Sequence, residues 1–245
     1  METDAQVDTP EGTPDKEEKG PRGSLLFLRE IAIVLVCALV LSVIVRTFFL
    51  QAFFVPSQSM ENTLMPDDRI VASKITTTIG GVNRGEVVVF KDPGGWLPAT
   101  RDSKSTGGIQ TALEFVGLAP SSSGDDLVKR VIGVGGDHVK CCNAKNQIVL
   151  NGVGLDESSY IKPGSQNEQV PFDIVVPDGR IFVMGDNRNE SADSRFHLNT
   201  NSGTVPVENV VGRVFVIVWP MKSWSGVPIP EIFDNPRLSD QGGES

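Results

Sequence analysis

Residues 126–133 read Asp126-Leu127-Val128-Lys129-Arg130-Val131-Ile132-Gly133, an apolar stretch with the character of a β-strand. Valine, isoleucine and leucine dominate it, and β-branched residues favour strands. Successive side chains of a strand point to opposite faces, so Lys129 and Arg130 are expected to face apart. The stretch therefore predicts a strand from which Lys129 can point into a dry site.

Short runs of the same kind recur along the chain, separated by glycine, proline, asparagine and aspartate. That spacing is typical of antiparallel strands joined by turns. The predicted fold class is therefore mainly β, with an antiparallel β-sheet or barrel-like domain preceded by one transmembrane α-helix. The predicted strands are residues 69–73, 86–90, 127–134, 138–140, 147–150, 180–184 and 210–218.

The transmembrane helix is predicted from an apolar segment near the N-terminus. Residues 31–45 carry no charge, and the apolar trend resumes over 48–55 after Arg46. A bilayer core about 30 Å thick needs roughly 20 helical residues, so the predicted span is 25–50. Arg46 can then reach the headgroups through its long stem. Residues 1–23 are rich in charge, proline and glycine, which predicts a disordered cytoplasmic tail.

A cleaved secretory signal is the alternative interpretation of this segment. The tail before it is long and acidic, and no small-x-small cleavage site follows it cleanly, which favours an uncleaved anchor. Lysines and arginines precede the uncharged run 31–45, the last being Arg29, whereas none follows Arg46 until Arg69. By the positive-inside rule, the N-terminus is predicted to be cytoplasmic and the domain after the span extracytoplasmic.

Composition sets the remaining boundaries. Residues 51–219 are predicted to form the extracytoplasmic β-rich domain, in which the glycine- and serine-rich residues 93–125 read as an insertion loop. Residues 141–179 are also predicted to have little regular secondary structure apart from one small hairpin. Residues 220–245 are predicted to be a loosely attached C-terminal tail. Trp219 just before this tail and Trp224 near its start are expected to pack on the domain rather than at a membrane interface.

Several functions are disfavoured by composition. The net charge of -9 argues against nucleic acid as the main partner, because phosphate binding needs clustered cations. The chain has two histidines, His138 and His197, and lacks paired cysteine ligands, so no metal and no cofactor are expected. Cys141 and Cys142 are adjacent, and we expect buried or loop thiols there rather than a vicinal disulfide.

Ser59 is the candidate nucleophile. It lies in Pro56-Ser57-Gln58-Ser59-Met60, a few residues beyond the predicted span. A serine hydroxyl is a weak nucleophile unless a base takes its proton, and Lys129 is the candidate base.

Three motifs in order along the chain carry a family resemblance. They are Ser57-x-Ser59-Met60, then Lys129-Arg130-Val131-Ile132-Gly133 with Gly135-Gly136-Asp137, then Gly185-Asp186-Asn187-Arg188-x3-Ala192-Asp193-Ser194-Arg195. Together they resemble the conserved boxes of bacterial type I signal peptidases, or leader peptidases of peptidase family S26, in the compact Gram-positive or actinobacterial form. One departure is Asn62, which stands where the family usually has proline.

The resemblance implies the signal peptidase fold and a serine protease with a serine-lysine dyad that cleaves N-terminal signal peptides after small residues. Ser59 is then the nucleophile and Lys129 the general base. Because an ordinary lysine is protonated near neutrality, burial must lower the pKa of Lys129.

The resemblance also assigns supporting roles. Ser57 and the Ser59 amide would stabilise the oxyanion, and Ser191 would orient the lysine amine. Asp193 and Arg195 would support the site as an ion pair, and Asp186 and Arg188 are weaker candidates. The segments implied to bind an extended substrate by strand addition contain Phe53, Phe54, Val55, Pro56, Asp126, Leu127 and Val128, with Met60 beside the nucleophile.

The expected partners are secretory preproteins and the lipid bilayer, close to the secretion translocon, and the expected location is the plasma membrane with a single span. Three alternatives stay open. A serine-histidine enzyme would need His138 or His197 beside Ser59, although neither stands at the family's base position. The others are a self-cleaving repressor-type protease, and an anchored β-domain that binds peptides without catalysis.

Overall fold

The computed structural model describes residues 21–75, 80–97, 126–165 and 170–238. Within them the chain divides between Leu41 and Ser42 into two compact units. The predicted tail 1–23 lies almost wholly outside the described residues, and the predicted insertion 93–125 mostly does.

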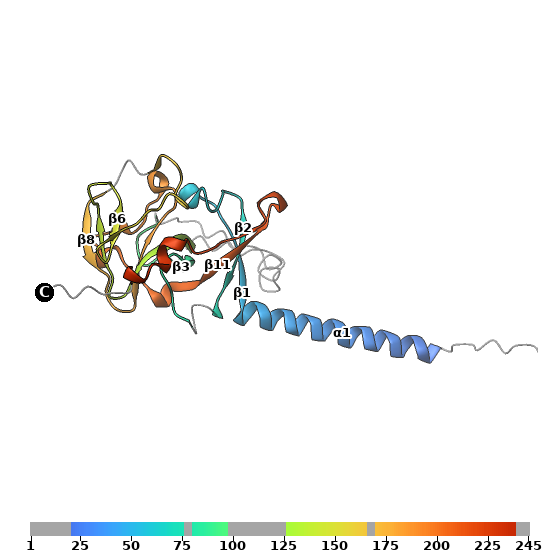
Figure 1. Cartoon of the computed structure of the whole chain (residues 1–245). Helices are drawn as coiled ribbons and strands as arrows, with labels where there is room; N and C mark the ends of the chain where they lie inside the picture. The colour runs from blue at the N-terminus through green and yellow to red at the C-terminus, as the bar shows by residue number, and fades with distance from the viewer. Residues whose placement is uncertain (1–20, 76–79, 98–125, 166–169, 239–245) are drawn as a thin grey trace, which may run out of the picture. The chain divides into compact units, whose positions relative to one another are not determined.

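Helix α1 runs over Pro21–Phe48 (Figure 1). Its residues up to Leu41 form the described part of the first unit, and the rest of the helix is counted in the second unit. Its window Leu26–Val43 is long and apolar enough to cross a membrane, and none of that window is buried. At about 1.5 Å per residue, 28 residues exceed the roughly 30 Å hydrocarbon core. The helix begins before the predicted span and ends at Phe48 rather than residue 50, because strand β1 starts at Leu50.

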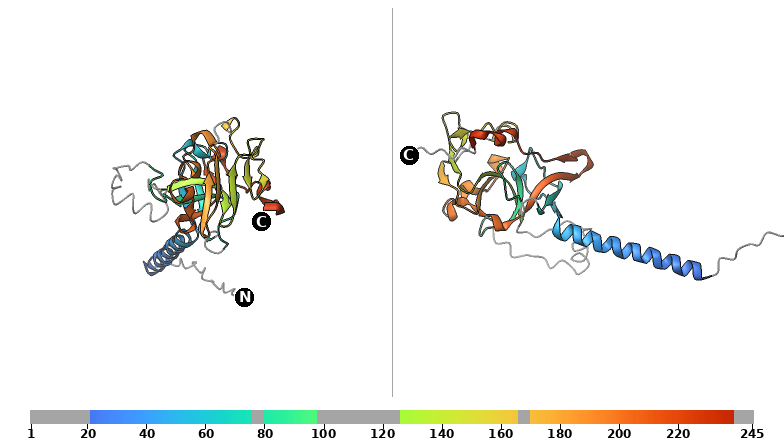
Figure 2. Two further views of the ribbon diagram at one scale, coloured as in Figure 1. Left: turned by 90° about the vertical axis from the view of Figure 1, so that its left-hand side faces the viewer. Right: turned by 60° about the horizontal axis from the view of Figure 1, so that its bottom comes forward.

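The larger sheet of the second unit is antiparallel and strongly curved (Figure 2). Among the described residues it has eight strands in the order β1-β2-β11-β3-β4-β9-β10, with β12 pairing β11. The strands are β1 (Leu50–Phe54), β2 (Arg69–Ser73), β3 (Val87–Lys91), β4 (Asp126–Val134), β9 (Arg180–Met184), β10 (Val205–Pro206), β11 (Val210–Trp219) and β12 (Ser225–Gly226).

A second, four-stranded sheet is built in the order β7-β6-β5-β8. It lies at the end of the unit away from β1 and β2 (Figure 1). Its strands are β5 (His138–Cys141), β6 (Ile148–Leu150), β7 (Val153–Gly154) and β8 (Phe172–Val175). The chain between 141 and 179 therefore contributes more order than its composition predicts.

In the described part of the chain, short 3-10 helices lie between the strands, and two more follow β12. They are η1 (Gln58–Met60), η3 (Arg188–Glu190), η4 (Ser194–Phe196), η5 (Asn201–Gly203), η6 (Val207–Asn209), η7 (Met221–Ser223), η8 (Glu231–Asp234) and η9 (Pro236–Leu238).

The core explains why these segments are strands. In β3 the run Val87–Phe90 is buried on both faces, as expected for a strand inside a curved sheet that packs on each side. One buried cluster joins β1 to Met60 and Leu64. The predicted fold class, mainly antiparallel β after one apolar helix, is confirmed.

Three expectations from composition are wrong. The predicted loose tail contributes Phe233 and Leu238 to the core of the smaller sheet, so residues 220–238 are attached to the domain. Trp219 and Trp224 are 52% and 66% exposed rather than packed on the domain. Cys141 and Cys142 form a disulfide rather than two thiols.

Candidate active site

The turn that carries Ser59 follows β1 directly. We call residues 57–64 the nucleophile turn. Pro56 precedes it, η1 forms its first part, and the amides of Thr63 and Leu64 both donate to the Met60 carbonyl. Met60 and Leu64 anchor the turn in the core, and Ser59 is 5% exposed. The sequence thus folds locally so that a polar hydroxyl is held against an apolar interior.

Lys129 reaches the same point from β4, where it lies opposite Val88 of β3. Its Nζ donates to Ser59 Oγ over 2.5 Å, and the side chain is 3% exposed. Burial lowers the pKa of Lys129 to about 8, because desolvation disfavours the ammonium. Asp193 and Asp186 act in the opposite direction, since anions stabilise the charged amine. A lysine with this pKa is neutral in an appreciable fraction of molecules near neutral pH.

Ser57 stands on the exposed side of Ser59. The two hydroxyl oxygens are 3.2 Å apart. The backbone at Ser57 is extended, with φ -125° and ψ 160°. Its hydroxyl can therefore be aimed at an oxygen that develops charge as Ser59 forms a bond to a carbonyl carbon.

Ser191 lies close to the dyad but makes no hydrogen bond to Lys129 among the described residues. Its Oγ is buried without a partner in hydrogen-bonding geometry, although it is near enough to Asp193 to help lower the pKa of that carboxyl. A Cβ added at Gly185 would lie 2.3 Å from Ser191 Oγ and 2.4 Å from the Ser59 carbonyl oxygen. Gly185 is therefore required for the close packing of these two serines.

Asp193 and Arg195 form a buried ion pair behind the dyad. Arg195 Nε lies 2.9 Å from Asp193 Oδ1, and the Gly185 amide donates to the same carboxylate over 3.0 Å. Burial alone would raise the pKa of Asp193, but hydrogen bonds and the charge of Arg195 hold it below its ordinary value. This carboxylate fixes the chain just after β9.

Arg130 extends to a different cluster from that of Lys129. Its guanidinium makes a bidentate pair with Asp186, with Nε and Nη2 at 2.9 and 2.7 Å from the two carboxylate oxygens. Thr63 donates to the same carboxylate. The nucleophile turn is thereby tied to the strand that carries the base.

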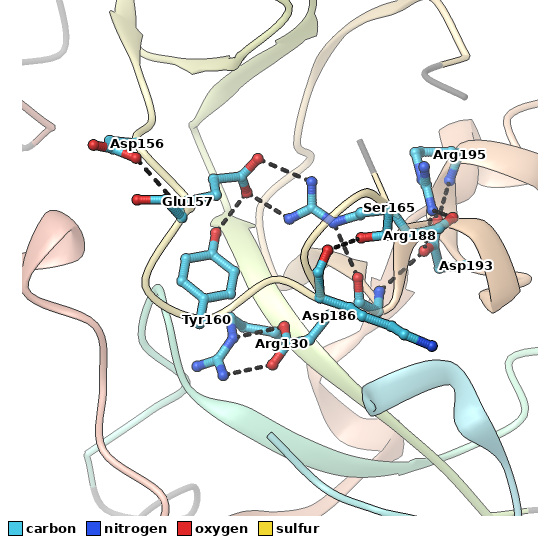
Figure 3. Close-up of polar contacts among 12 residues, drawn as sticks. Arg130, Asp156, Glu157, Tyr160, Ser165, Asp186, Arg188, Asp193 and Arg195 are labelled. Atoms are coloured by element: carbon cyan, nitrogen blue, oxygen red, sulfur yellow. Dashed lines mark hydrogen bonds and ion pairs between the residues drawn. The ribbon is translucent and has the colours of Figure 1, made fainter. Parts of the chain in front are cut away.

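Glu157 is a site residue that motif reasoning missed. It is 1% exposed and pairs with Arg188 through both carboxylate oxygens, at 2.9 and 2.5 Å (Figure 3). The charge of Glu157 outweighs burial and raises the pKa of Arg188. Arg188 Nε also donates to the Gly185 carbonyl. Only the buried cation at Arg188 could have indicated that an acidic partner was needed.

The segments predicted to bind substrate contain both buried and exposed side chains. Phe53, Val55 and Met60 have their side chains in the core, at 2%, 2% and 1% exposure, so only their backbone can meet a peptide. Phe54 and Pro56 are exposed.

The strand pairing leaves room for an added peptide. Among the described residues, β1 is the first strand of its sheet and pairs only β2. β9 pairs β4 from Arg130 onward, so Leu127 and Val128 have β3 as their strand partner. Asp126, at the start of β4, lies opposite Lys91 and forms an ion pair with it.

The two histidines take no part in the dyad. His138 pairs with Asp173 on the surface, and His197 stacks on Trp96 with ring centroids 4.5 Å apart. The hydroxyl of Ser59 instead meets Lys129 and Ser57. The geometry does not support a serine-histidine enzyme.

Comparison with known proteins gives consistent matches. The family model described as signal peptidase, peptidase S26, matches residues 28–219. A probable signal peptidase I of Mycobacterium leprae is 39% identical over 231 residues, which cover 82% of this chain and 79% of that protein. A signal peptidase I of Mycobacterium tuberculosis is 36% identical over 250 residues, covering 92% and 83%. A crystal structure of a signal peptidase I from Enterococcus faecalis aligns with 54% of this chain and 95% of that one, at 23% identity and a TM-score of 0.34.

Proposed function

The chain belongs to the signal peptidase family, peptidase S26, and from this we propose that it removes signal peptides from secretory preproteins with a dyad of Ser59 and Lys129. It is a serine protease of the signal peptidase I type. The observation that carries the proposal is the buried contact of 2.5 Å between Lys129 Nζ and Ser59 Oγ. A nucleophile and its base must stand within this reach.

The proposed reaction begins with neutral Lys129. Its amine takes the hydroxyl proton as Ser59 Oγ attacks the scissile carbonyl, and a tetrahedral intermediate forms. The Ser57 hydroxyl and the Ser59 amide donate to the oxyanion. Lys129 then protonates the leaving amine, and the mature protein departs from an acyl-enzyme. Water, deprotonated by the same lysine, hydrolyses the ester and frees the signal peptide.

Asp193, Arg195, Asp186 and Arg188 are proposed to hold this geometry rather than to react. All four are buried at 1% exposure or less and are paired. Ser191 is proposed to orient the Lys129 amine once substrate is bound, since its buried hydroxyl has a free hydrogen-bonding capacity beside the dyad.

Substrate is proposed to add as a strand. The edge of β1 that has no strand partner among the described residues, and the first half of β4, would supply the backbone groups for this pairing. Backbone pairing has little side-chain preference, so small residues near the cut would be selected by shallow pockets.

The enzyme is membrane-anchored, and the proposed location is the plasma membrane with the N-terminus cytoplasmic, close to the translocon. Exposed apolar side chains gather at one end of the large sheet. Phe54 and Trp219 both lie opposite Arg69 in the strand register, and Trp224 follows on the β11–β12 hairpin. Tryptophan favours the membrane interface, so we propose that this end contacts lipid.

Cleavage of a purified preprotein tests the proposal. Wild type should release a mature protein with a new N-terminus after a small residue. Ser59→Ala and Lys129→Ala should lose at least about a thousandfold in rate. Full activity in either variant would refute the dyad.

A further inference from the structure

Asn62 has a backbone conformation that its family counterpart cannot take. Its φ is +95°, whereas the proline usual at this position is locked near -65°. A residue with a side chain is strained at positive φ, and asparagine tolerates it better than most. The nucleophile turn of this chain therefore needs something other than a proline ring to hold it.

The side chain of Asn62 supplies a contact to a distant segment. Its Nδ2 donates to the Tyr160 carbonyl over 2.9 Å. The neighbouring Glu61 pairs with Lys162 over 2.6 Å. We call residues 157–162 the brace, because both links end in this one segment. Two adjacent residues of the nucleophile turn thus reach the same segment about a hundred positions later in the sequence.

The brace is itself firmly fixed. The hydroxyl of Tyr160 donates to Glu157, which is paired with buried Arg188 (Figure 3). The guanidinium of Arg130 lies 4.6 Å from the centre of the Tyr160 ring. The Lys162 amide donates to the Asp186 carbonyl over 2.9 Å. The tether of Asn62 therefore ends on a rigid support and not on a loop free to follow the turn.

The side chain of Asn62 is not held in place by packing, apart from its hydrogen bond to Tyr160. Asn62 and Thr63 line an open pocket of about 910 Å³, whose lining also includes residues 228–232 of the C-terminal segment. Asn62 itself is exposed. Met60 and Leu64 pack on the core on either side, but Asn62 borders open space, so at this residue the hydrogen bond to Tyr160 is the contact that positions the turn.

We propose that Asn62 is a positioning residue for Ser59, which acts by tying the nucleophile turn to the brace through the Tyr160 carbonyl. The inference rests on the proposed role of Ser59 as nucleophile. It assigns Asn62 no contact with substrate. Its effect is to keep Ser59 Oγ within reach of Lys129 Nζ throughout the reaction.

Two variants separate the tether from the backbone conformation. Asn62→Gly accommodates the positive φ but has no side chain, and Asn62→Ala loses the tether while keeping the strain. Because both variants lose the hydrogen bond to Tyr160, both should lower kcat about three- to tenfold, with KM changed less than about twofold. Asn201→Ala is the matched control. Asn201 is exposed, with φ +50°, in η5, and this variant should leave kcat unchanged.

Hydrogen–deuterium exchange of the full-length protein in detergent gives a readout that does not need activity. In both Asn62 variants, the amides of Thr63 and Leu64 should exchange faster, while those of β3 should not. Unchanged exchange of the turn would overturn the proposal. So would a wild-type kcat in Asn62→Gly. If wild type cleaved no preprotein, the proposed function would fail, whereas the exchange result would still decide whether Asn62 holds the turn.

Discussion

Lys129 and Arg130 are neighbours in β4, yet among the residues that the structure describes only Arg130 has a carboxylate as its direct hydrogen-bonding partner. Lys129 Nζ meets the neutral hydroxyl of Ser59, whereas Arg130 makes a bidentate pair with Asp186. The alternation of a strand separates them. One cation can therefore lose its proton, while the other stays charged and tied to the nucleophile turn.

The rate of cleavage is expected to depend on the pKa of Lys129. Because the neutral amine is the active form, kcat/KM should rise with pH and level off above about 8, the value to which burial lowers this pKa. Initial rates on a signal-peptide substrate across the pH range check this. A profile that is flat from about pH 6 to 9 would contradict the assignment of Lys129 as the base.

Burial of Lys129 should lower the free energy of unfolding at neutral pH. Its pKa is near 8 in the folded protein and about 10.4 when unfolded, so the unfolded state binds more protons between these values. The free energy of unfolding should thus rise with pH from about 8 to 10, and below pH 8 the penalty should be on the order of 3 kcal/mol. Lys129→Met should be more stable than wild type at neutral pH and lose this pH dependence. Lys140→Met, at an exposed lysine, should do neither.

The strand pattern predicted the mainly β fold, because alternation and turn residues are local signals. The motif order singled out Ser59 and Lys129 as partners, and the two side chains are in contact in the structure. Glu157 lies between motifs, and its partner Arg188 is distant in the chain, so no spacing rule could have found it. The core positions of Phe53 and Met60 were also missed, since an apolar side chain beside a nucleophile can face substrate or interior with the same local pattern. Loose composition concealed β8 and the buried Phe233, whose order comes from distant contacts.

Ser57→Ala should reduce kcat about a hundredfold, or ~3 kcal/mol of transition-state stabilisation, with KM little changed. The reason is that the hydroxyl beside Ser59 Oγ would donate to an oxyanion that exists only during reaction. Steady-state kinetics measure the split. Ser57→Thr keeps the hydroxyl and should retain much more of the rate. An unchanged kcat in Ser57→Ala would remove Ser57 from the oxyanion site.

Glu157→Gln should destabilise the protein by about 3–5 kcal/mol, because it leaves the buried Arg188 without its counter-charge. Adding Arg188→Met should recover part of the loss, since the uncompensated charge is then gone. Denaturant unfolding of wild type, both single variants and the double variant gives the coupling energy. Additive losses would show that the two side chains do not stabilise one another.

Trp219→Glu and Trp224→Glu should slow cleavage of a preprotein embedded in lipid vesicles but not cleavage of a soluble peptide. Both side chains are mostly exposed, and neither belongs to the candidate active site. Brominated lipids provide a direct measurement, because they quench tryptophan that touches the bilayer, and the remaining Trp96 is buried. Val175→Glu is the control at an exposed apolar residue of the smaller sheet. Equal slowing by all three would point to charge alone, whereas slowing by the tryptophan variants only would place this end of the sheet on the membrane.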